Sequence, residues 1–516
     1  MNIVKATLTV GSFTAISRVL GFARDLLIAA VLGAGAAADA FFVSFKLANL
    51  LRRLFAEGAF NAAFVPLFAR ALEGDGREEA RRFAEEAMAV MTVALLAVVL
   101  VAEIAMPWLV RGLAPGFAPD GERYGLAVEL SRITFPYLML ISLAALFSGV
   151  LNSLGRFAAA AFAPIILNVV LITTLLLATL HPATPAHALA WGVAVAGVLQ
   201  LAWVAVAAHR NGMGLRLRRP RLTPRLKRLF QLMLPGAIGS GVYQINLIVD
   251  TWFASLLPVG AVSYLFYADR LNQLPLGIIG VAIGTALLPM LSRQLRVADF
   301  AAASRTQNRA IEIGLLFTLP AAAGLIVLAE PIIAVLFERR AFGPVETAAT
   351  AGALVAFSIG LPAYVLIKVL APGFFAREDT ATPVKVAALC LVANVLLILA
   401  LIGPLRHVGI ALATALSNCL NVACLAWILH RRGHLHIDAR LRRIVPRIVG
   451  ATLAMALVLV AARLGLGFLP GALRLVLAIA SGSLCFILVC HWTGAADFAE
   501  LSRMVSRRRP ATEPGA

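Results

Sequence analysis

Eight basic side chains lie within stretches of sequence that are otherwise apolar, and they are the residues of this chain best suited to binding chemistry. They are Arg18, Arg24, Lys46, Arg52, Arg53, Arg132, Arg270 and Lys368. A guanidinium group keeps its charge at physiological pH and offers a planar fork of donors that matches two phosphate oxygens. A charge near the centre of a membrane helix costs about 2.5 to 3.5 kcal/mol even on the most lenient scale, so it needs water or a partner. The set predicts a wet interior that binds an anion, with phosphate as the best match.

Acidic residues in the same stretches allow a second interpretation, in which the bases form ion pairs that hold helices together. These acids are Asp25, Asp39, Glu57, Asp250 and Asp269. Pairing alone does not explain why arginine dominates, so we interpret the bases as the lining of a binding cavity. Arg132 is the exception, because it lies near a predicted helix start and its long side chain would reach the headgroups.

Helical spacing places several of these charges on common faces. At 100° per residue, two positions seven apart differ by only about 20° around a helix. The pairs with this spacing are Arg18 with Asp25, Asp39 with Lys46, Lys46 with Arg53, and Ser263 with Arg270. Three predicted helices therefore each present a polar face, as helices around a common interior would.

The elements that must position these residues are membrane helices. Of the 516 residues, 61% are hydrophobic and 14% charged, with mean hydropathy +0.90, which excludes a water-soluble globular protein. A helix needs about 20 apolar residues to cross the hydrocarbon. The stretches long enough are 9–33, 37–68, 86–109, 127–153, 159–180, 187–208, 230–256, 262–292, 307–329, 346–372, 382–402, 407–430, 445–466 and 471–492. We predict an all-α polytopic membrane protein of about fourteen transmembrane helices.

The positive charge follows this topology. Of the 45 Lys and Arg, 30 fall in or beside the loops and tails on one side of the predicted helices and 7 on the other. This asymmetry predicts that both termini are cytoplasmic, and it explains the net charge of +19 without a nucleic-acid partner. The first helix is retained, since Arg18, Arg24 and Asp25 interrupt the apolar core that a signal peptide needs. The five cysteines fall within predicted helices and are interpreted as packing residues.

A basic segment divides the chain. Residues 210–229 hold eight Lys and Arg and are interpreted as a linker between lobes that lies at anionic headgroups. The predicted domains are a six-helix lobe at 1–209, this linker, a second six-helix lobe at 230–431, two additional helices at 432–493 and a cytoplasmic tail at 494–516. At a constant offset of 223 residues, Asn49 meets Asn272 and Pro66 meets Pro289, which favours two related lobes around a central cavity.

Two runs near the amino terminus carry a family resemblance. SRVLGFARDLLIAAVLGAG and ADAFFVSFKLANLLRRLFAEGAFNAAFVPLF resemble the MurJ/MviN family of lipid II flippases, within the multidrug/oligosaccharidyl-lipid/polysaccharide exporter superfamily. The resemblance implies alternating access, which carries the undecaprenyl-diphosphate-linked peptidoglycan precursor from the inner to the outer leaflet of the bacterial cytoplasmic membrane. It also implies that the last two helices form a groove for the lipid tail.

The resemblance and the charge pattern together define the predicted substrate-binding set. Its members are Arg18, Arg24, Asp25, Asp39, Asn49, Arg52, Arg53, Ser263, Arg270 and Lys368. The arginines would take the diphosphate, and Asp25 and Asp39 would orient them or form gate pairs.

A cation site is a weaker expectation. Asp250, Asn394 and Thr414 would offer oxygen ligands for sodium, but Ile398 stands where relatives place a second acid. Asp250 is alternatively a proton site or a hydrogen-bonded buried acid, and we favour the last of these. No cofactor is expected, and no GxxxxGK[ST] run for ATP is present, so energy would come from a sodium or proton gradient or the membrane potential.

Other function classes fit less well. The nearest alternative is a flippase for another diphosphate-linked oligosaccharide, such as O-antigen units. A drug/cation antiporter needs acids in its cavity, whereas here bases dominate. An enzyme would need a clustered acid or metal constellation, and no paired-acid motif is present. The expected partners are lipid II, membrane lipids and proteins of peptidoglycan synthesis, and no nucleic acid is expected.

Overall fold

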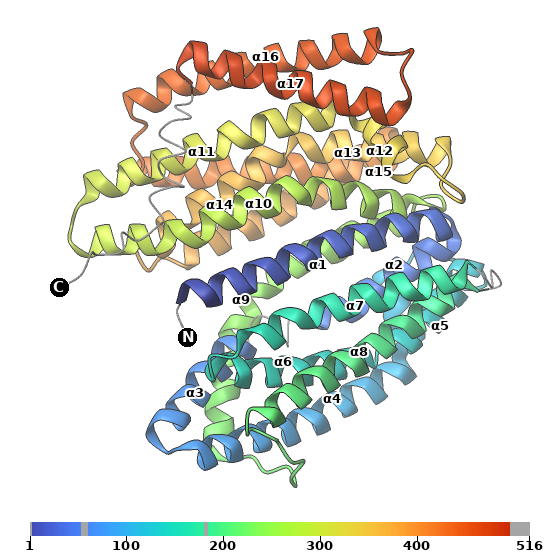
Figure 1. Cartoon of the computed structure of the whole chain (residues 1–516), viewed down its shortest axis with the longest axis vertical. Helices are drawn as coiled ribbons and strands as arrows, with labels where there is room; N and C mark the ends of the chain where they lie inside the picture. The colour runs from blue at the N-terminus through green and yellow to red at the C-terminus, as the bar shows by residue number, and fades with distance from the viewer. Residues whose placement is uncertain (1–2, 53–59, 180–183, 496–516) are drawn as a thin grey trace. The chain divides into compact units, whose positions relative to one another are not determined.

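The computed structural model describes residues 3–52, 60–179 and 184–495. In these residues it contains seventeen α-helices and no strand, only an isolated bridge between Arg339 and Phe342 (Figure 1). The prediction of an all-α membrane protein is confirmed. The chain divides into two compact units, which are described separately: Met1–Tyr267 with Phe337–Glu346, and Ala268–Leu336 with Thr347–Ala516.

The helices of the first unit come from the first half of the chain. They are α1 (Ile3–Leu32), α2 (Ala36–Arg52), α3 (Phe60–Gly74), α4 (Arg77–Leu113), α5 (Glu122–Thr134), α6 (Tyr137–Ser153), α7 (Phe157–Ala178), α8 (Pro185–Arg210) and α9 (Pro224–Ser255). The first turns of α10 (Ala261–Arg296) also belong to this unit. The predicted stretch 37–68 thus covers α2 and α3, and residues 53–59 between them lie outside the described part.

The second unit holds the rest of α10 and the later helices. These are α11 (Phe300–Val327), α12 (Ala329–Phe337), α13 (Pro344–Ile359), α14 (Leu361–Phe375), α15 (Ala381–Arg431), α16 (Ala439–Gly465) and α17 (Gly471–Thr493). Within α15, Arg406 has a non-helical backbone at φ 49° and ψ −129°. This kink separates the two predicted spans 382–402 and 407–430, which the helix joins.

Nine helical segments of the described residues are long and apolar enough to cross a membrane, so the chain is a multi-pass membrane protein. They cover ten of the fourteen predicted stretches, because α15 contains two. The remaining four predicted stretches, 9–33, 37–68, 230–256 and 262–292, carry most of the charges within predicted spans. The exact count of fourteen therefore stays a prediction.

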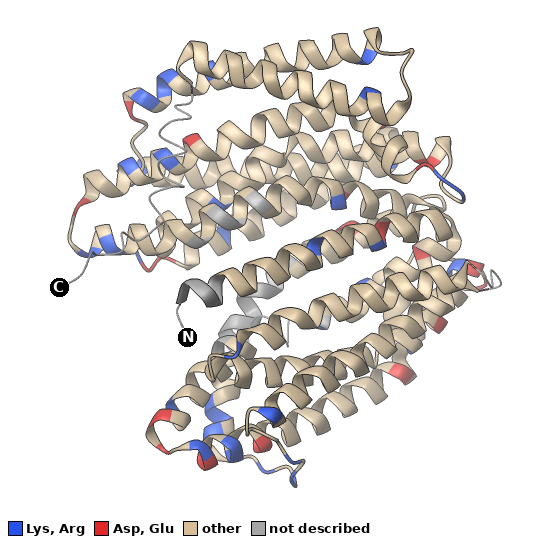
Figure 2. Cartoon of the chain, viewed as in Figure 1, with Lys and Arg blue, Asp and Glu red and all other residues tan. Residues whose placement is uncertain are grey.

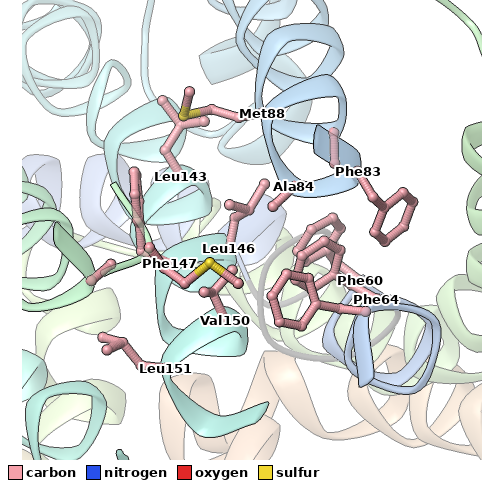
Figure 3. Packing of buried hydrophobic residues seen from close by; sticks show 14 of the residues in the cluster. Phe60, Phe64, Phe83, Ala84, Met88, Leu143, Leu146, Phe147, Val150 and Leu151 are labelled. Carbon is pink, nitrogen blue, oxygen red and sulfur yellow. The ribbon is translucent and has the colours of Figure 1, made fainter. Parts of the chain in front are cut away.

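Aromatic packing fills the interior of the first unit between α3, α4 and α6 (Figure 3). The Phe64 ring stacks on those of Phe60 and Phe83, with centroids 5.0 and 5.6 Å apart. Gly149 lets α6 come close to the Phe64 ring of α3, since a Cβ at this glycine would lie only 3.1 Å from that ring. Because lipid tails are as apolar as these rings, close packing and not removal from water holds the helices together here.

Helix α16 packs against α17 and onto α11 (Figure 1). At Gly482 the helices α16 and α17 approach so closely that a Cβ would lie 2.5 Å from Leu459 Cδ2. Ion pairs join both ends of α16 to neighbouring helices, Arg440 to Glu312 at 3.1 Å and Arg463 to Glu330 at 2.6 Å. The lobe boundaries and the lipid-tail groove stay predictions.

Candidate functional site

Arg24 is held inside the first unit by two different acceptors. Its Nε and Nη2 donate to Asp25 Oδ1 at 3.0 and 2.7 Å, and its Nη1 donates to Asn168 Oδ1 at 2.9 Å. The side chains of Arg24 and Asp25 are almost fully buried. Burial of an arginine is tolerable only with such pairing, so the guanidinium and carboxylate neutralise each other in this state.

Asn168 of α7 has its amide orientation set by α1. Its Nδ2 donates to the carbonyl oxygen of Ser17 at 2.9 Å and faces the Ser17 hydroxyl at 3.3 Å. Its Oδ1 is thereby left to face Arg24. Gly21 of α1 faces the same amide, and a Cβ there would be in ordinary van der Waals contact with Asn168 at 3.6 Å. One amide therefore fixes both the packing of α1 on α7 and the direction of the Arg24 guanidinium.

Aromatic rings surround this pair. Arg24 and Asp25 line a small apolar recess with Ile28, Phe41, Phe42, Phe45, Leu171 and Phe266, and these side chains leave no room for a water molecule. The Arg24 guanidinium lies 5.9 Å from the centre of the Phe45 ring, within cation–π range. A dry, low-dielectric surrounding strengthens the Arg24–Asp25 attraction.

Asp39 caps the N-terminus of α10. Its Oδ2 accepts a hydrogen bond from the Gly260 N–H at 2.8 Å, and its Oδ1 accepts from the N–H and hydroxyl of Ser263 at 3.0 and 2.6 Å. Both side chains are fully buried. A carboxylate is favoured at this place because the first N–H groups of a helix lack partners and carry partial positive charge. The structure thus brings together Asp39 and Ser263, two residues of the predicted site.

The neighbourhood of Asp39 holds further contacts within the first unit. Arg123 Nη1 lies 3.7 Å from Asp39 Oδ2, and its guanidinium stacks over the Phe117 ring at 4.7 Å. The Tyr267 hydroxyl donates to the Gly33 carbonyl at 2.8 Å. The Ala341 N–H donates to the Ala30 carbonyl at 3.3 Å, so the segment after α12 packs on the end of α1.

The other described candidate residues of α2 have hydrogen-bond partners of their own. Lys46 Nζ donates to Thr251 Oγ1 of α9 at 2.7 Å. Asn49 donates to the Phe45 carbonyl and accepts from Arg52 Nε, each at 2.9 Å. Arg52 is half-buried at the end of the helix and lies beside Asn49. Arg53 and Glu57 lie outside the described residues.

Three other predicted residues occupy different settings. Arg18 has an exposed side chain on α1, and Arg270 is half-buried on α10 in the second unit. Lys368 of α14 lies against α10, because a Cβ on Gly280 would be 3.0 Å from its Cδ. The roles of all three in binding substrate stay predictions.

The residues of the expected cation site belong to both units. Asp250 is half-buried on α9 of the first unit. Asn394 and Thr414 are buried on α15 of the second unit, where the Thr414 carbonyl accepts a hydrogen bond from Asn418 Nδ2 at 2.7 Å. A cation site formed by these residues stays a prediction.

Sequence reasoning missed Asn168 and Arg123. Asn168 is a single amide within the apolar run IILNVVLI, and an isolated amide of this kind in a membrane helix signals a buried partner. Arg123 lies in the first turn of α5, where a basic residue near the end of an apolar stretch is unremarkable by pattern alone. Its position beside Asp39 follows only from the fold.

Comparisons with known proteins agree on one family. The family model described as lipid II flippase MurJ matches residues 28–473. A probable lipid II flippase MurJ of Rhizobium tropici is 46% identical over 99% of this chain and 98% of its own length.

Two solved structures share the fold. A structure described as lipid II flippase MurJ in an inward closed conformation matches 93% of this chain and 98% of its own, with TM-score 0.79 and 26% identity. An inward-facing multidrug resistance MATE transporter of the MOP superfamily covers 83% of this chain and 98% of its own, with TM-score 0.69 and 16% identity, which shows a common fold alone. The chain belongs to the lipid II flippase MurJ family.

Proposed function

We propose that this multi-pass membrane protein translocates lipid II from the inner to the outer leaflet of the bacterial cytoplasmic membrane. The observation that carries the proposal is the 46% identity over 99% of the chain with a probable lipid II flippase. Translocation moves a molecule without making or breaking its bonds, so the protein acts as a transporter. The O-antigen alternative is not favoured, because the relatives are named for lipid II.

Arg24 gives the proposal a chemical basis. A diphosphate that enters hydrocarbon without its water pays a large desolvation penalty, and a fixed guanidinium replaces part of the lost hydration. Two Arg24 nitrogens share one oxygen of Asp25, so an incoming diphosphate would compete for the same donors. This exchange would keep each contact modest and allow release.

Alternating access would then follow from exchanging partners. In one state Arg24 pairs with Asp25, and in another it would bind the diphosphate together with Arg18, Arg52, Arg53, Arg270 and Lys368. Asp39 and Ser263 would form a gate pair where α10 begins. Asn49 would support Arg52 through the hydrogen bond that joins them.

The orientation and the energy source complete the proposal. The excess of Lys and Arg on one side of the helices supports cytoplasmic termini. Outward movement of an anion is favoured by a membrane potential that is negative inside. Coupling to sodium or protons through Asp250, Asn394 and Thr414 would supply a further driving force, and enzymes of peptidoglycan synthesis would supply and consume the substrate.

Depletion of the protein in living cells tests the function directly. We expect lipid II to accumulate on the cytoplasmic side, where an amine-reactive reagent that cannot cross membranes leaves its stem peptide unlabelled. Cells that carry Arg24→Ala should show the same block at normal protein level. Arg132→Gln is the matched control, since it also removes a charge within a span but has an exposed side chain and should retain translocation. Undiminished labelling of lipid II after depletion would refute the proposal.

A further inference from the structure

A short segment between α8 and α9 is fixed onto the start of α4. This segment, residues 211–223, is called the strap. Glu85 Oε1 accepts a hydrogen bond from the Arg216 N–H at 3.1 Å, and Glu85 Oε2 accepts from Arg218 Nε at 2.5 Å. The Glu85 side chain is fully buried. The middle of the strap is therefore held at one place on α4 rather than free to move as a loose tether.

Both ends of the strap are anchored as well. At its start, the Arg77 guanidinium donates to the Asn211 carbonyl, and Met213 is fully buried in the apolar core of the first unit. At its end, the Thr223 hydroxyl donates to Glu86 Oε2 at 3.0 Å. Fixed ends mean that the side chains between them project from a defined backbone.

Four acidic residues beside the strap have basic partners, while a fifth, Glu86, accepts the hydrogen bond from Thr223. The pairs are Glu78 with Arg81, Glu79 with Arg82, Glu85 with Arg218, and Asp75 with Arg225. Figure 2 shows acids and bases interspersed at this end of the first unit. Arg219 and Arg221 of the strap are exposed, and neither forms an ion pair with any residue in the described ranges. Their charges are thus available to an external anion.

Exposed apolar side chains flank these two arginines. Leu217 is 67% exposed and Leu222 is 62% exposed. An arginine pair with a leucine on each side matches the boundary between headgroups and acyl chains, where guanidinium groups meet phosphates and leucines enter the apolar layer. A nucleic acid would leave the leucines in water, so a lipid is the better partner.

We propose that Arg219 and Arg221, with Leu217 and Leu222, form a docking surface for anionic phospholipid of the cytoplasmic leaflet. The strap connects the helices α8 and α9, both within the first unit, so bound lipid would tether this unit to the leaflet from which substrate is taken. The choice of leaflet rests on the proposed topology. The affinity of the strap for anionic lipid should rise about five-fold for each basic residue near the membrane surface.

The test uses the full chain in vesicles, with the native cysteines replaced and a fluorophore on Pro220→Cys, between the two arginines. The vesicles contain phosphatidylcholine and phosphatidylglycerol, and either lipid carries bromine on its acyl chains at the same mole fraction. We expect stronger quenching by brominated phosphatidylglycerol, and we expect 0.5 M NaCl to weaken that preference because exposed charges are screened.

Two double variants decide the outcome. Arg219→Gln/Arg221→Gln should remove the preference, so that both brominated lipids quench equally. Arg296→Gln/Arg305→Gln removes the same charge from exposed positions in the second unit and should leave the preference intact. Equal quenching by the two lipids in the parent protein, or an unchanged preference in Arg219→Gln/Arg221→Gln, would overturn the proposal. The assay measures no transport, so its failure is separate from failure of the proposed function.

Discussion

Asp39 and Ser263, which are 224 positions apart in the sequence, share two hydrogen bonds at the N-terminus of α10. The same carboxylate also accepts from the Gly260 N–H. Gly260 has φ +97°, and a Cβ there would lie 2.7 Å from the Ala34 carbonyl oxygen. Only glycine fits at this turn, because both the backbone angle and the close approach exclude a side chain. The contact between α2 and α10 is therefore specified at several residues together.

Asp39→Asn should destabilise the protein although the side chain keeps its size. An amide offers one oxygen where the carboxylate offers two, so its NH₂ group would face an N–H donor. Loss of a buried hydrogen bond to a charged group costs about 1.5 to 3 kcal/mol. Thermal unfolding of the purified protein measures the effect. Ser263→Ala removes only the hydroxyl and should cost about 1 kcal/mol; equal stability of Asp39→Asn and the parent protein would refute the capping role.

Much of the fold could be predicted because hydrocarbon thickness sets the length of an apolar helix. The breaks within helices were harder. The predicted stretch 127–153 contains two helices, α5 and α6, which separate at Phe135 and Pro136, and 346–372 is divided at Gly360 between α13 and α14. Prolines occur in unbroken membrane helices too, so their presence alone does not locate a break.

The sequence predicts which residue types form the candidate site better than it predicts their hydrogen-bond partners. Arg24 and Asp25 are adjacent in sequence and about 100° apart around a helix, so their spacing alone does not predict that they pair. They pair because the long arginine side chain bends back across the helix surface. The contacts of Asp39 with Gly260, and of Arg24 with Asn168, join distant segments, so no local pattern could identify them.

Asn168→Ala should weaken the packing of α1 on α7 and release one side of the Arg24 guanidinium. The buried Nη1 donor would lose its acceptor, which costs about 1 to 3 kcal/mol. We expect a lower unfolding temperature and weaker binding of lipid II by the purified protein. Asn418→Ala is the matched control, since that amide donates to a carbonyl one turn back in its own helix and its loss should have little effect. Full substrate affinity in Asn168→Ala would show that Asn168 does not position Arg24.

Gly33→Ala should disturb the segment that packs on the end of α1. Gly33 has φ +64°, and a Cβ there would lie 2.3 Å from the Ala341 carbonyl oxygen. The left-handed backbone alone costs an alanine about 1 to 2 kcal/mol, and the contact with Ala341 must also open. Thermal unfolding should show the loss. Gly35→Ala provides the comparison, because nothing lies within 4 Å of its Cβ position; similar losses in both variants would contradict a specific role for Gly33.

Asp379 predicts a dependence of stability on pH. It lies in the connection between α14 and α15, outside the membrane-spanning segments. Hydrogen bonds from the Thr382 hydroxyl and from Arg432, each at 2.6 Å, hold the pKa of Asp379 well below its ordinary value of 3.8. A lowered pKa in the folded state means that the stabilisation is fully present above the ordinary pKa and is lost as pH falls through the folded-state pKa.

The stability difference between the parent protein and Asp379→Asn should therefore be constant from pH 7 to about pH 5 and shrink below about pH 4. Chemical unfolding at a series of pH values measures it. Asp299→Asn offers a comparison, since that carboxylate accepts one backbone hydrogen bond at the start of α11 and forms no ion pair with an arginine among the described residues. A difference that grows as the pH falls would have the wrong sign for this mechanism.

Glu312 joins α11 to α16. We expect removal of the ion pair at this end of α16 to lower the free energy of unfolding more than removal of the pair at the other end. The Glu312 side chain is 10% exposed and pairs with both Arg309 and Arg440. Glu312→Gln leaves two arginines, 39% and 41% exposed, without their shared carboxylate. Because water still solvates these guanidinium groups, we expect a loss of about 1.5 to 3 kcal/mol, the range for hydrogen bonds to a charged group. Arg440→Gln should cost less, because Arg309 still neutralises Glu312.

The pair at the other end of α16, Arg463 with Glu330, has side chains that are 43% and 58% exposed. Glu330→Gln should therefore change the unfolding free energy by no more than about 1 kcal/mol. Proteolysis of the connection at 432–438 reports the same difference independently, since detachment of α16 from α11 would expose that connection to cleavage. Equal sensitivity of Glu312→Gln and Glu330→Gln would mean that burial does not determine how strongly α16 is held.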